Sequence, residues 1–405
     1  MGLQTLKVAF ARADVTPDRP CRMGGYNRSQ VSEGVLDPIE VNVVAMEIEG
    51  VPFILAVLDS IMVSEEFAAC VQARVSEACH VPCAHITTCA IHTHSAPAYF
   101  KLAFEETPAE EELTDGLLDR MIGLCTDAWQ NLRPASCSMA RMEVEGLYGN
   151  RNVKDGPADK TCTVFTFAAP DGMVMGRLLN ISTHPTILNG GNLMLSSDLI
   201  GQTRIRLEDA WGEPVVCTNG VCGDVSTRFY RKGSGVSELE RTADELAEQI
   251  LDRLEPVALD LGLPVSGEIR MPVVYDARSD ADCARALAKA ETDPDSPWSK
   301  FIINRVAFKR EISPIKMTLI SRYVVAGNLV VVTMPCDTCS ALGLKIKRAF
   351  PGHEVIVVGY ANTYCNYLVP DEDYGKYFET MNARTARGQA DCFVQRVIDT
   401  VRAAL

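Results

Sequence analysis

The sequence predicts an α/β fold in which mixed β-sheets are flanked by helices, and two patterns support this. Short apolar runs rich in β-branched residues recur through the 405-residue chain. Segments with helical periodicity lie between them, and strands alternating with helices are typical of α/β proteins. We expect strands near residues 41–47, 52–58, 85–91, 163–168, 175–181, 215–218, 329–333 and 354–358. We expect helices near residues 65–79, 111–132, 199–211, 238–254, 281–290 and 380–405.

No segment clearly divides the chain. Residues 276–300 are the most polar and least periodic stretch, and their Asp-Pro and Ser-Pro pairs are turn signals. This stretch could form an excursion from the main body. Because α/β folds often reach such a length as one unit, we expect a single domain over residues 1–405.

Composition narrows the classes of partner. The chain is 47% hydrophobic and 23% charged, which is typical of a globular protein. Its net charge of -14 argues against a nucleic acid or an anionic lipid surface as partner. The sequence contains neither a run of 18 apolar residues nor a recognisable signal peptide, so we expect a cytoplasmic protein without a transmembrane segment. Nothing in it indicates an oligomeric state.

The 15 cysteines are expected to be reduced and mostly buried, because their number is odd and they are scattered through a chain too large to need disulfides. Cys336 and Cys339 form an isolated CxxC pair. Without a second pair this spacing is a weak indication of structural zinc. Buried thiols are the better interpretation.

Three histidines follow expected strands. Residues 86–91 run directly into His92, Thr93 and His94, so two imidazoles project from one side of a strand end. Residues 178–182 lead to His184, which the following proline holds in an extended backbone. Neutral imidazole is a common zinc ligand, and α/β proteins place sites at strand ends. On spacing alone, a histidine at a strand end is more often a hydrogen-bonded structural residue than a metal ligand, so spacing does not decide between the two interpretations.

A glycine-containing turn, residues 219–226 (NGVCGDVS), follows the apolar run at 215–218. It could present the Ser226 hydroxyl and free backbone N–H groups to a cleft. The simpler interpretation is an ordinary turn in which Asp224 makes an Asx-type hydrogen bond. Further along, Tyr360, Tyr364 and Tyr367 would ordinarily pack as amphipathic residues.

Taken together and in order, these segments resemble the catalytic domain of the neutral/alkaline, non-lysosomal ceramidase family. The likeness covers nearly the whole chain, and HTHSAP and GDVS are its most specific strings. It rests on residues 11–17 (ARADVTP), 23–26 (MGGY), 88–97 (TCAIHTHSAP), 150–151 (NR), 183–186 (THPT), 197–198 (SD), 223–226 (GDVS), 359–362 (GYAN) and Tyr367.

The resemblance implies a zinc-dependent hydrolase that cleaves an amide (N-acyl) bond. A bound zinc ion would lower the pKa of a water molecule to about 7 and so provide a nucleophile. The implied zinc ligands are His92, His184, Asp337 and Tyr367. The implied groups around the reacting carbonyl are His94, Arg151, Tyr377 and Ser226, the last as nucleophile or substrate orienter.

The sequence departs from the family in several respects. Asp337 stands where the family has a glutamate ligand, and Cys336 and Cys339 could compete as soft ligands. We also expect the signal peptide and the C-terminal β-sandwich of the secreted ceramidases to be absent. Since an acidic chain without a basic amphipathic surface has little means to extract a membrane lipid, we expect a substrate smaller than ceramide or different from it.

Two other functions stay open. A serine acyl-hydrolase would use Ser226 as nucleophile, and it would need a base within hydrogen-bond reach. A catalytically silent homologue would keep the fold and bind a metal or a ligand. The aspartate at position 337 favours the silent homologue, because function depends on the site and not on the fold.

Overall fold

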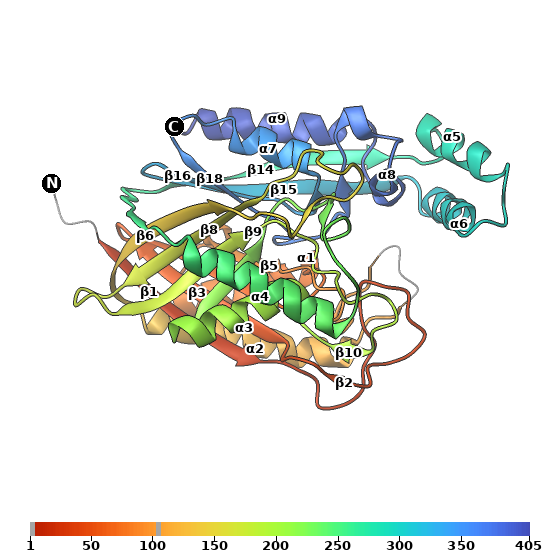
Figure 1. Cartoon of the computed structure of the whole chain (residues 1–405). Helices are drawn as coiled ribbons and strands as arrows, with labels where there is room; N and C mark the ends of the chain where they lie inside the picture. Colours follow the sequence, from red (N-terminus) through yellow and green to blue (C-terminus); the bar gives the residue numbers. More distant parts are fainter. Residues whose placement is uncertain (1–4, 103–106) are drawn as a thin grey trace.

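A larger and a smaller β-sheet lie face to face at the centre of the protein, and helices cover their outer sides (Figure 1). The computed structural model describes residues 5–102 and 107–405. Buried residues of both sheets, such as Ile54 and Val358, belong to one hydrophobic cluster. The expected α/β class, with mixed sheets flanked by helices, is confirmed.

The larger sheet has the strand order β11-β9-β8-β6-β1-β3-β4-β5, with β13 beside β6. Its neighbours are antiparallel except for the parallel pairs β4–β5 and β9–β11. Its strands are β1 (Leu6–Asp14), β3 (Glu40–Ile48), β4 (Val51–Leu58), β5 (Ile86–Ala90), β6 (Arg133–Glu143), β8 (Thr161–Ala168), β9 (Val174–Ile181), β11 (Val215–Asn219) and β13 (Val257–Ala258).

The smaller sheet consists of β14 (Val265–Tyr275), β15 (Ile315–Ala326), β16 (Leu329–Thr333) and β18 (Glu354–Val358). Its last two strands are parallel, and the other neighbours are antiparallel. Between β14 and β15 the chain forms α5 (Ala281–Ala290) and α6 (Pro297–Glu311), which project at one end of the molecule (Figure 1). The polar stretch at 276–300 is therefore an excursion, as expected, but it is largely helical.

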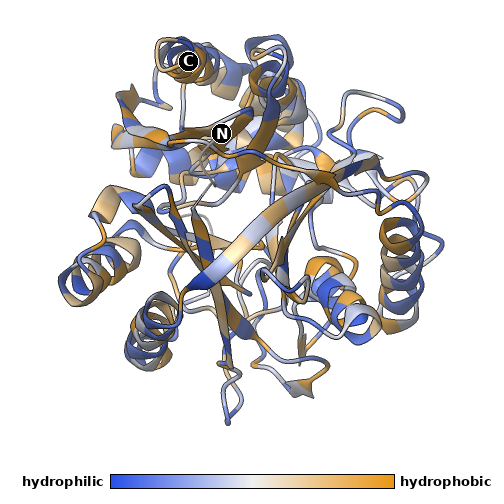
Figure 2. Ribbon diagram, turned by 90° about the vertical axis from the view of Figure 1, so that its left-hand side faces the viewer, coloured by the Kyte–Doolittle hydropathy of each residue, from blue (hydrophilic) through white to orange (hydrophobic). Residues whose placement is uncertain are grey.

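The helices turn apolar stripes toward the sheets and surround the strands at the periphery (Figure 2). On α1, Phe67, Val71 and Val75 are buried at a spacing of four residues, which places them on one face. None of the helices within the described residues is long and apolar enough to cross a membrane. The covering helices are α1 (Glu65–Cys79), α2 (Glu111–Gln130), α3 (Asp198–Trp211) and α4 (Val236–Asp252) on the larger sheet, with α7 (Ser340–Lys347) and α9 (Gln389–Arg402) on the smaller one.

The C-terminal helix differs from the expectation of one helix over 380–405. A short helix, α8 (Phe378–Asn382), comes first, and α9 begins only at Gln389. Gly388 lies between them with φ 80°, a left-handed conformation that cannot continue a right-handed helix. This break frees α8 to lie beside the strand ends of the smaller sheet.

The cysteines behave as the sequence predicts. All 15 lie within the described ranges, and all are free thiols. Only Cys70, Cys83 and Cys392 among them are exposed. The interpretation as reduced, mostly buried thiols is confirmed.

The carboxyl ends of several strands from both sheets meet at one place. The segment 359–362, which follows β18, closes the gap between the ends of β5 and β11. Its backbone makes hydrogen bonds from Gly359 N to Asn219 O (2.8 Å) and from Asn362 N to Thr88 O (2.7 Å). Strand ends that lead into loops are where α/β proteins collect functional side chains. Most of the predicted site residues follow β5, β9, β11, β16 or β18 at this junction, whereas Arg151 and Tyr377 belong to other segments.

Candidate metal centre

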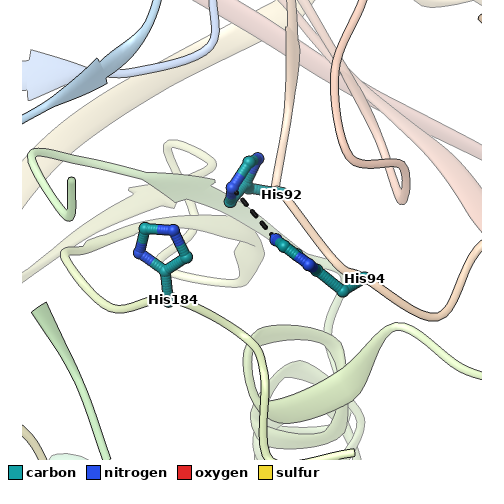
Figure 3. A group of neighbouring side chains, drawn as sticks. All are labelled: His92, His94 and His184. Atoms are coloured by element: carbon teal, nitrogen blue, oxygen red, sulfur yellow. Dashed lines mark hydrogen bonds between the residues drawn. The ribbon is translucent and has the colours of Figure 1, made fainter. Parts of the chain in front are cut away.

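The imidazoles of His92, His94 and His184 turn toward one another at this junction (Figure 3). His92 and His94 follow β5, and His184 follows β9. The Nε2 atoms of His92 and His94 are 3.2 Å apart, and the ring centres of His92 and His184 are 4.9 Å apart. One nitrogen from each ring lies within 4.8 Å of the others, which is close enough to share a metal ion.

Backbone carbonyl groups fix the orientation of all three rings. Each Nδ1 atom lies 2.5–2.8 Å from a carbonyl oxygen, which can only accept a hydrogen bond. Nδ1 therefore carries the proton, and Nε2 presents its lone pair to the common centre. Metal-binding histidines are held in this way. The accepting carbonyl groups belong to Ile61 for His92, Gly25 for His94 and Cys222 for His184.

Burial keeps two of these rings neutral. It lowers the pKa of His92 to about 4 and that of His94 well below its ordinary value. At neutral pH neither Nε2 atom carries a proton, so their approach to 3.2 Å is not a hydrogen bond. A cation nearby would offset the repulsion between the two lone pairs.

Asp337 places a carboxylate against the same centre. It begins the short strand β17 (Asp337–Thr338) after β16, and its Oδ1 lies 3.3 Å from His92 Nε2 and 3.2 Å from His184 Nε2. Tyr360 donates a hydrogen bond to Oδ1 at 2.7 Å, and Tyr364 donates one to Oδ2. The aspartate is thus long enough to reach both imidazoles, although it is shorter than a glutamate.

The Asp337 carboxylate is held in its charged form. Burial acts to raise its pKa, whereas the positive charge of a protonated His92 or His184 and the hydrogen bond from the Tyr364 hydroxyl lower it, and the pKa stays below its usual range. Hydrogen bonds to the charged form favour ionisation. A single negative charge therefore faces neutral nitrogen lone pairs, which is an environment suited to a divalent cation.

Tyr367 completes the group from the strand beside Asp337. It begins β19 (Tyr367–Leu368), which pairs with β17, and its hydroxyl lies 3.4 Å from His184 Nε2. Burial raises the pKa of Tyr367, and the Arg151 guanidinium, 3.1 Å from the phenol oxygen, opposes that effect. Arg151 is itself held by Glu379 at 2.8 Å. Arg151 therefore favours an electron-rich oxygen on Tyr367.

The spacing of these atoms fits a zinc-sized cation. Zinc binds nitrogen and oxygen at about 2.0–2.1 Å, so two ligands at tetrahedral corners lie about 3.3–3.4 Å apart. The separations that link His92, Asp337, His184 and Tyr367 are 3.3, 3.2 and 3.4 Å. Imidazole nitrogen and carboxylate oxygen are also donors that zinc prefers. His94 offers a further nitrogen to the same centre.

The backbone around the centre is strained. His92, Tyr360 and Asn366 adopt φ values of 72°, 56° and 62°, a left-handed conformation that is uncommon for residues other than glycine. Such residues typically cost about 1–3 kcal/mol each and cluster at functional sites. For His92 the conformation is held by hydrogen bonds from its backbone N to Ser60 and from its ring to Ile61.

Comparison with known proteins supports the fold. No protein-family model matches the sequence, and no curated protein matches it. Among solved structures, neutral ceramidase from Pseudomonas aeruginosa matches with a TM-score of 0.78 at 17% identity, over 99% of this chain and 75% of that chain. A ceramidase described as complexed with C2 matches with a TM-score of 0.77 at 16% identity, over 99% of this chain and 76% of that chain. The chain has the fold of neutral ceramidase.

Ser226 lies at the edge of the centre in this ceramidase fold. It belongs to β12 (Val225–Ser226), which pairs with β7 (Gly149–Asn150), and the backbone N of His184 donates to Val225 O at 3.1 Å. The Ser226 hydroxyl accepts a hydrogen bond from Arg228 N at 3.2 Å. Within the described ranges, no histidine or carboxylate is hydrogen-bonded to it. A serine nucleophile would therefore lack its base.

Asp224 does not form the local Asx-type hydrogen bond that the sequence suggested. Its carboxylate bridges distant segments, accepting hydrogen bonds from the backbone N and hydroxyl of Ser340 and from Asn150 Nδ2. Through Asp224, the turn at 219–226 that follows β11 is therefore hydrogen-bonded to the end of β7 and to the start of α7. These hydrogen-bond partners of Asp224 are more than 70 positions away in the sequence, so local sequence spacing could not predict them.

Tyr377 stands immediately before α8. Its side chain forms no hydrogen bond with any residue in the described part of the chain, so its role near the substrate stays a prediction. Its two neighbours do reach the centre: Glu379 binds Arg151, and the Phe378 ring lies 6.1 Å from the Tyr367 ring.

The sequence did not predict the roles of several residues at the centre. Tyr360 and Tyr364 hold the Asp337 carboxylate, and their signal was the tyrosine-rich string at 359–367. Glu379 holds Arg151 and had no signal in the sequence. Cys222 is the thiol nearest the centre, since its Sγ groups with His184 and Asp337 within 4.8 Å. Among the described residues, Cys336 and Cys339 belong to neither possible ligand group.

Gly25 allows the close approach of the segment that orients His94. It has φ 92°, and a Cβ atom there would lie 2.6 Å from His94 Cβ. We expect Gly25→Ala to lower the free energy of unfolding by about 1–3 kcal/mol more than Gly50→Ala, because overpacking adds to backbone strain. Gly50 is the matched control, since it has φ 80° but no described atom within 4 Å of its Cβ position. Urea denaturation of both variants measures the difference, and equal losses would contradict the expectation.

Proposed function

We propose that the protein is a zinc-dependent hydrolase that cleaves an amide (N-acyl) bond. The observation that carries this proposal is the convergence of the Nε2 atoms of His92 and His184 on the Asp337 carboxylate at tetrahedral ligand spacing. The ceramidase fold of the chain supports the same reaction class. The zinc ligands would be His92, His184, Asp337 and Tyr367.

The side chains around the centre have different roles in the proposed amide hydrolysis. A zinc ion held there supplies Lewis-acid chemistry, which acidifies water and polarises a carbonyl group. The unprotonated Nε2 of His94 is oriented to accept a proton from the attacking water. His94 can donate that proton to the leaving nitrogen only afterwards. The positive charge of Arg151 is placed to stabilise the developing oxyanion, a contribution of about 3 kcal/mol in comparable sites.

The substrate is proposed to be smaller than ceramide or different from it, and the test is a comparison of substrates. Protein loaded with one equivalent of zinc is assayed for release of the free carboxylic acid from N-acyl amino acids, N-acyl amines, short acyl esters and ceramide. We expect amide hydrolysis that a chelator abolishes and added zinc restores. If fully zinc-loaded protein turned over none of these compounds, the proposal would fail and a silent binding homologue would be favoured.

A serine mechanism is tested separately by Ser226→Ala. Because no described base is hydrogen-bonded to the Ser226 hydroxyl, we expect kcat to fall by no more than about 10-fold and to remain sensitive to chelators. Ser234→Ala, at an exposed position, is the control. Loss of all turnover with zinc content unchanged would instead identify Ser226 as the nucleophile.

A further inference from the structure

The loop of residues 228–232 (RFYRK), here called the basic loop, starts at the edge of the candidate metal centre. Arg228 N donates to the Ser226 hydroxyl at 3.2 Å, and the Arg228 guanidinium reaches the backbone oxygen of Arg151 at 3.5 Å. The first cation of the basic loop therefore lies beside Arg151, which faces the reacting carbonyl in the proposed reaction.

The second cation of the basic loop, Arg231, lies three residues beyond Arg228 and is exposed. The Tyr26 ring is 5.0 Å from the His94 ring and so forms part of the wall around the centre. Burial, followed by the charge of Asp198, raises the pKa of Tyr26 to about 12, and the positive charges of Arg28, Arg231 and Arg151 oppose this. Arg231 therefore acts electrostatically on this wall of the centre.

The cations of the basic loop are not neutralised by the protein. Arg228, Arg231 and Lys232 are exposed, and no acidic side chain of the described ranges lies within 4.0 Å of their charged groups. Glu238, the carboxylate that touches the loop, accepts from the Lys232 backbone N and is paired with Arg241. In a chain of net charge -14, this is a local positive region beside the site, and such a region attracts anions.

We propose that Arg228 and Arg231 bind the carboxylate of an anionic substrate, so that the substrate class is an N-acyl amino acid. The inference rests on the proposed amide hydrolysis and deepens it. Arginine is suited to the task because its planar guanidinium binds a carboxylate with two parallel hydrogen bonds. A neutral lipid amide gains nothing from these charges.

The test compares N-decanoylglycine with N-decanoylethanolamine, which carries a neutral hydroxymethyl group in place of the carboxylate. We expect kcat/KM to be at least about 10-fold higher for the glycine compound, and this preference to shrink as salt is added. Arg228→Gln and Arg231→Gln should each lower the ratio of the two kcat/KM values by about 10-fold, the effect of one charge-assisted hydrogen bond. Arg120→Gln, at an exposed position of α2, is the matched control and should leave the ratio unchanged.

The outcomes separate the two proposals. Hydrolysis of both compounds with a ratio near one that neither arginine variant alters would overturn the anionic substrate class and leave the hydrolase intact. If neither compound is hydrolysed, the wider substrate comparison decides the hydrolase, and calorimetric binding of the same two compounds decides the inference. Tighter binding of N-decanoylglycine that is lost in Arg231→Gln would sustain it, and equal affinities would overturn it.

Discussion

Replacing His184 with alanine is expected to abolish zinc binding and, with it, amide hydrolysis. His184 Nε2 lies 3.2 Å from Asp337 Oδ1 and 3.4 Å from the Tyr367 hydroxyl, so its loss removes a ligand that lies against two of the three other proposed ligands. Loss of an outer partner of a metal ligand typically costs 10–100-fold in affinity, and we expect a larger effect here. Elemental analysis after dialysis should give about one zinc per chain in the parent protein and near zero in the variant.

The matched control is His80→Asn. His80 is exposed at the end of α1 with φ 57°, a conformation that asparagine tolerates well. We expect its zinc content and kcat/KM to equal those of the parent. If His184→Ala retained a full equivalent of zinc, the centre described here would not be the metal site.

Among the variants proposed here, Arg151→Met is expected to cause the largest loss in the free energy of unfolding. The variant leaves the Glu379 carboxylate without its cation, and only 2% of that side chain is exposed. Removing one partner of a buried ion pair typically costs about 3–5 kcal/mol. Urea denaturation should reveal a loss of this size, and the hydrolytic rate should fall as well, because the charge near Tyr367 is gone.

The double variant Arg151→Met with Glu379→Gln separates charge from packing. Since it removes the unpaired carboxylate, we expect it to recover a large part of the lost stability but none of the activity. Arg151→Lys keeps the charge but not the fork of hydrogen bonds, so its stability should be intermediate. A loss below about 1 kcal/mol in Arg151→Met would show that Glu379 is not held by this ion pair.

Much of the fold could be predicted from apolar periodicity, but some elements were missed. The long strands β14 and β15 mix charged and apolar residues, because parts of them are exposed to solvent. They therefore lack the continuous apolar run that marks β16 and β18. Helix α6 carried a clear start signal, Ser296 followed by Pro297, which the polar character of the surrounding stretch obscured.

By itself, the sequence determined the α/β class, the reduced state of the cysteines and the imidazoles at the ends of β5 and β9. These features depend on local pattern, which a linear chain displays directly. Only the tertiary structure decided which ring nitrogens face the centre, that Asp337 reaches them, and that Tyr360, Tyr364 and Glu379 hold the charged groups. Those contacts join positions as far apart as His92 and Asp337, which 245 positions separate, and side-chain identity alone does not specify such pairings.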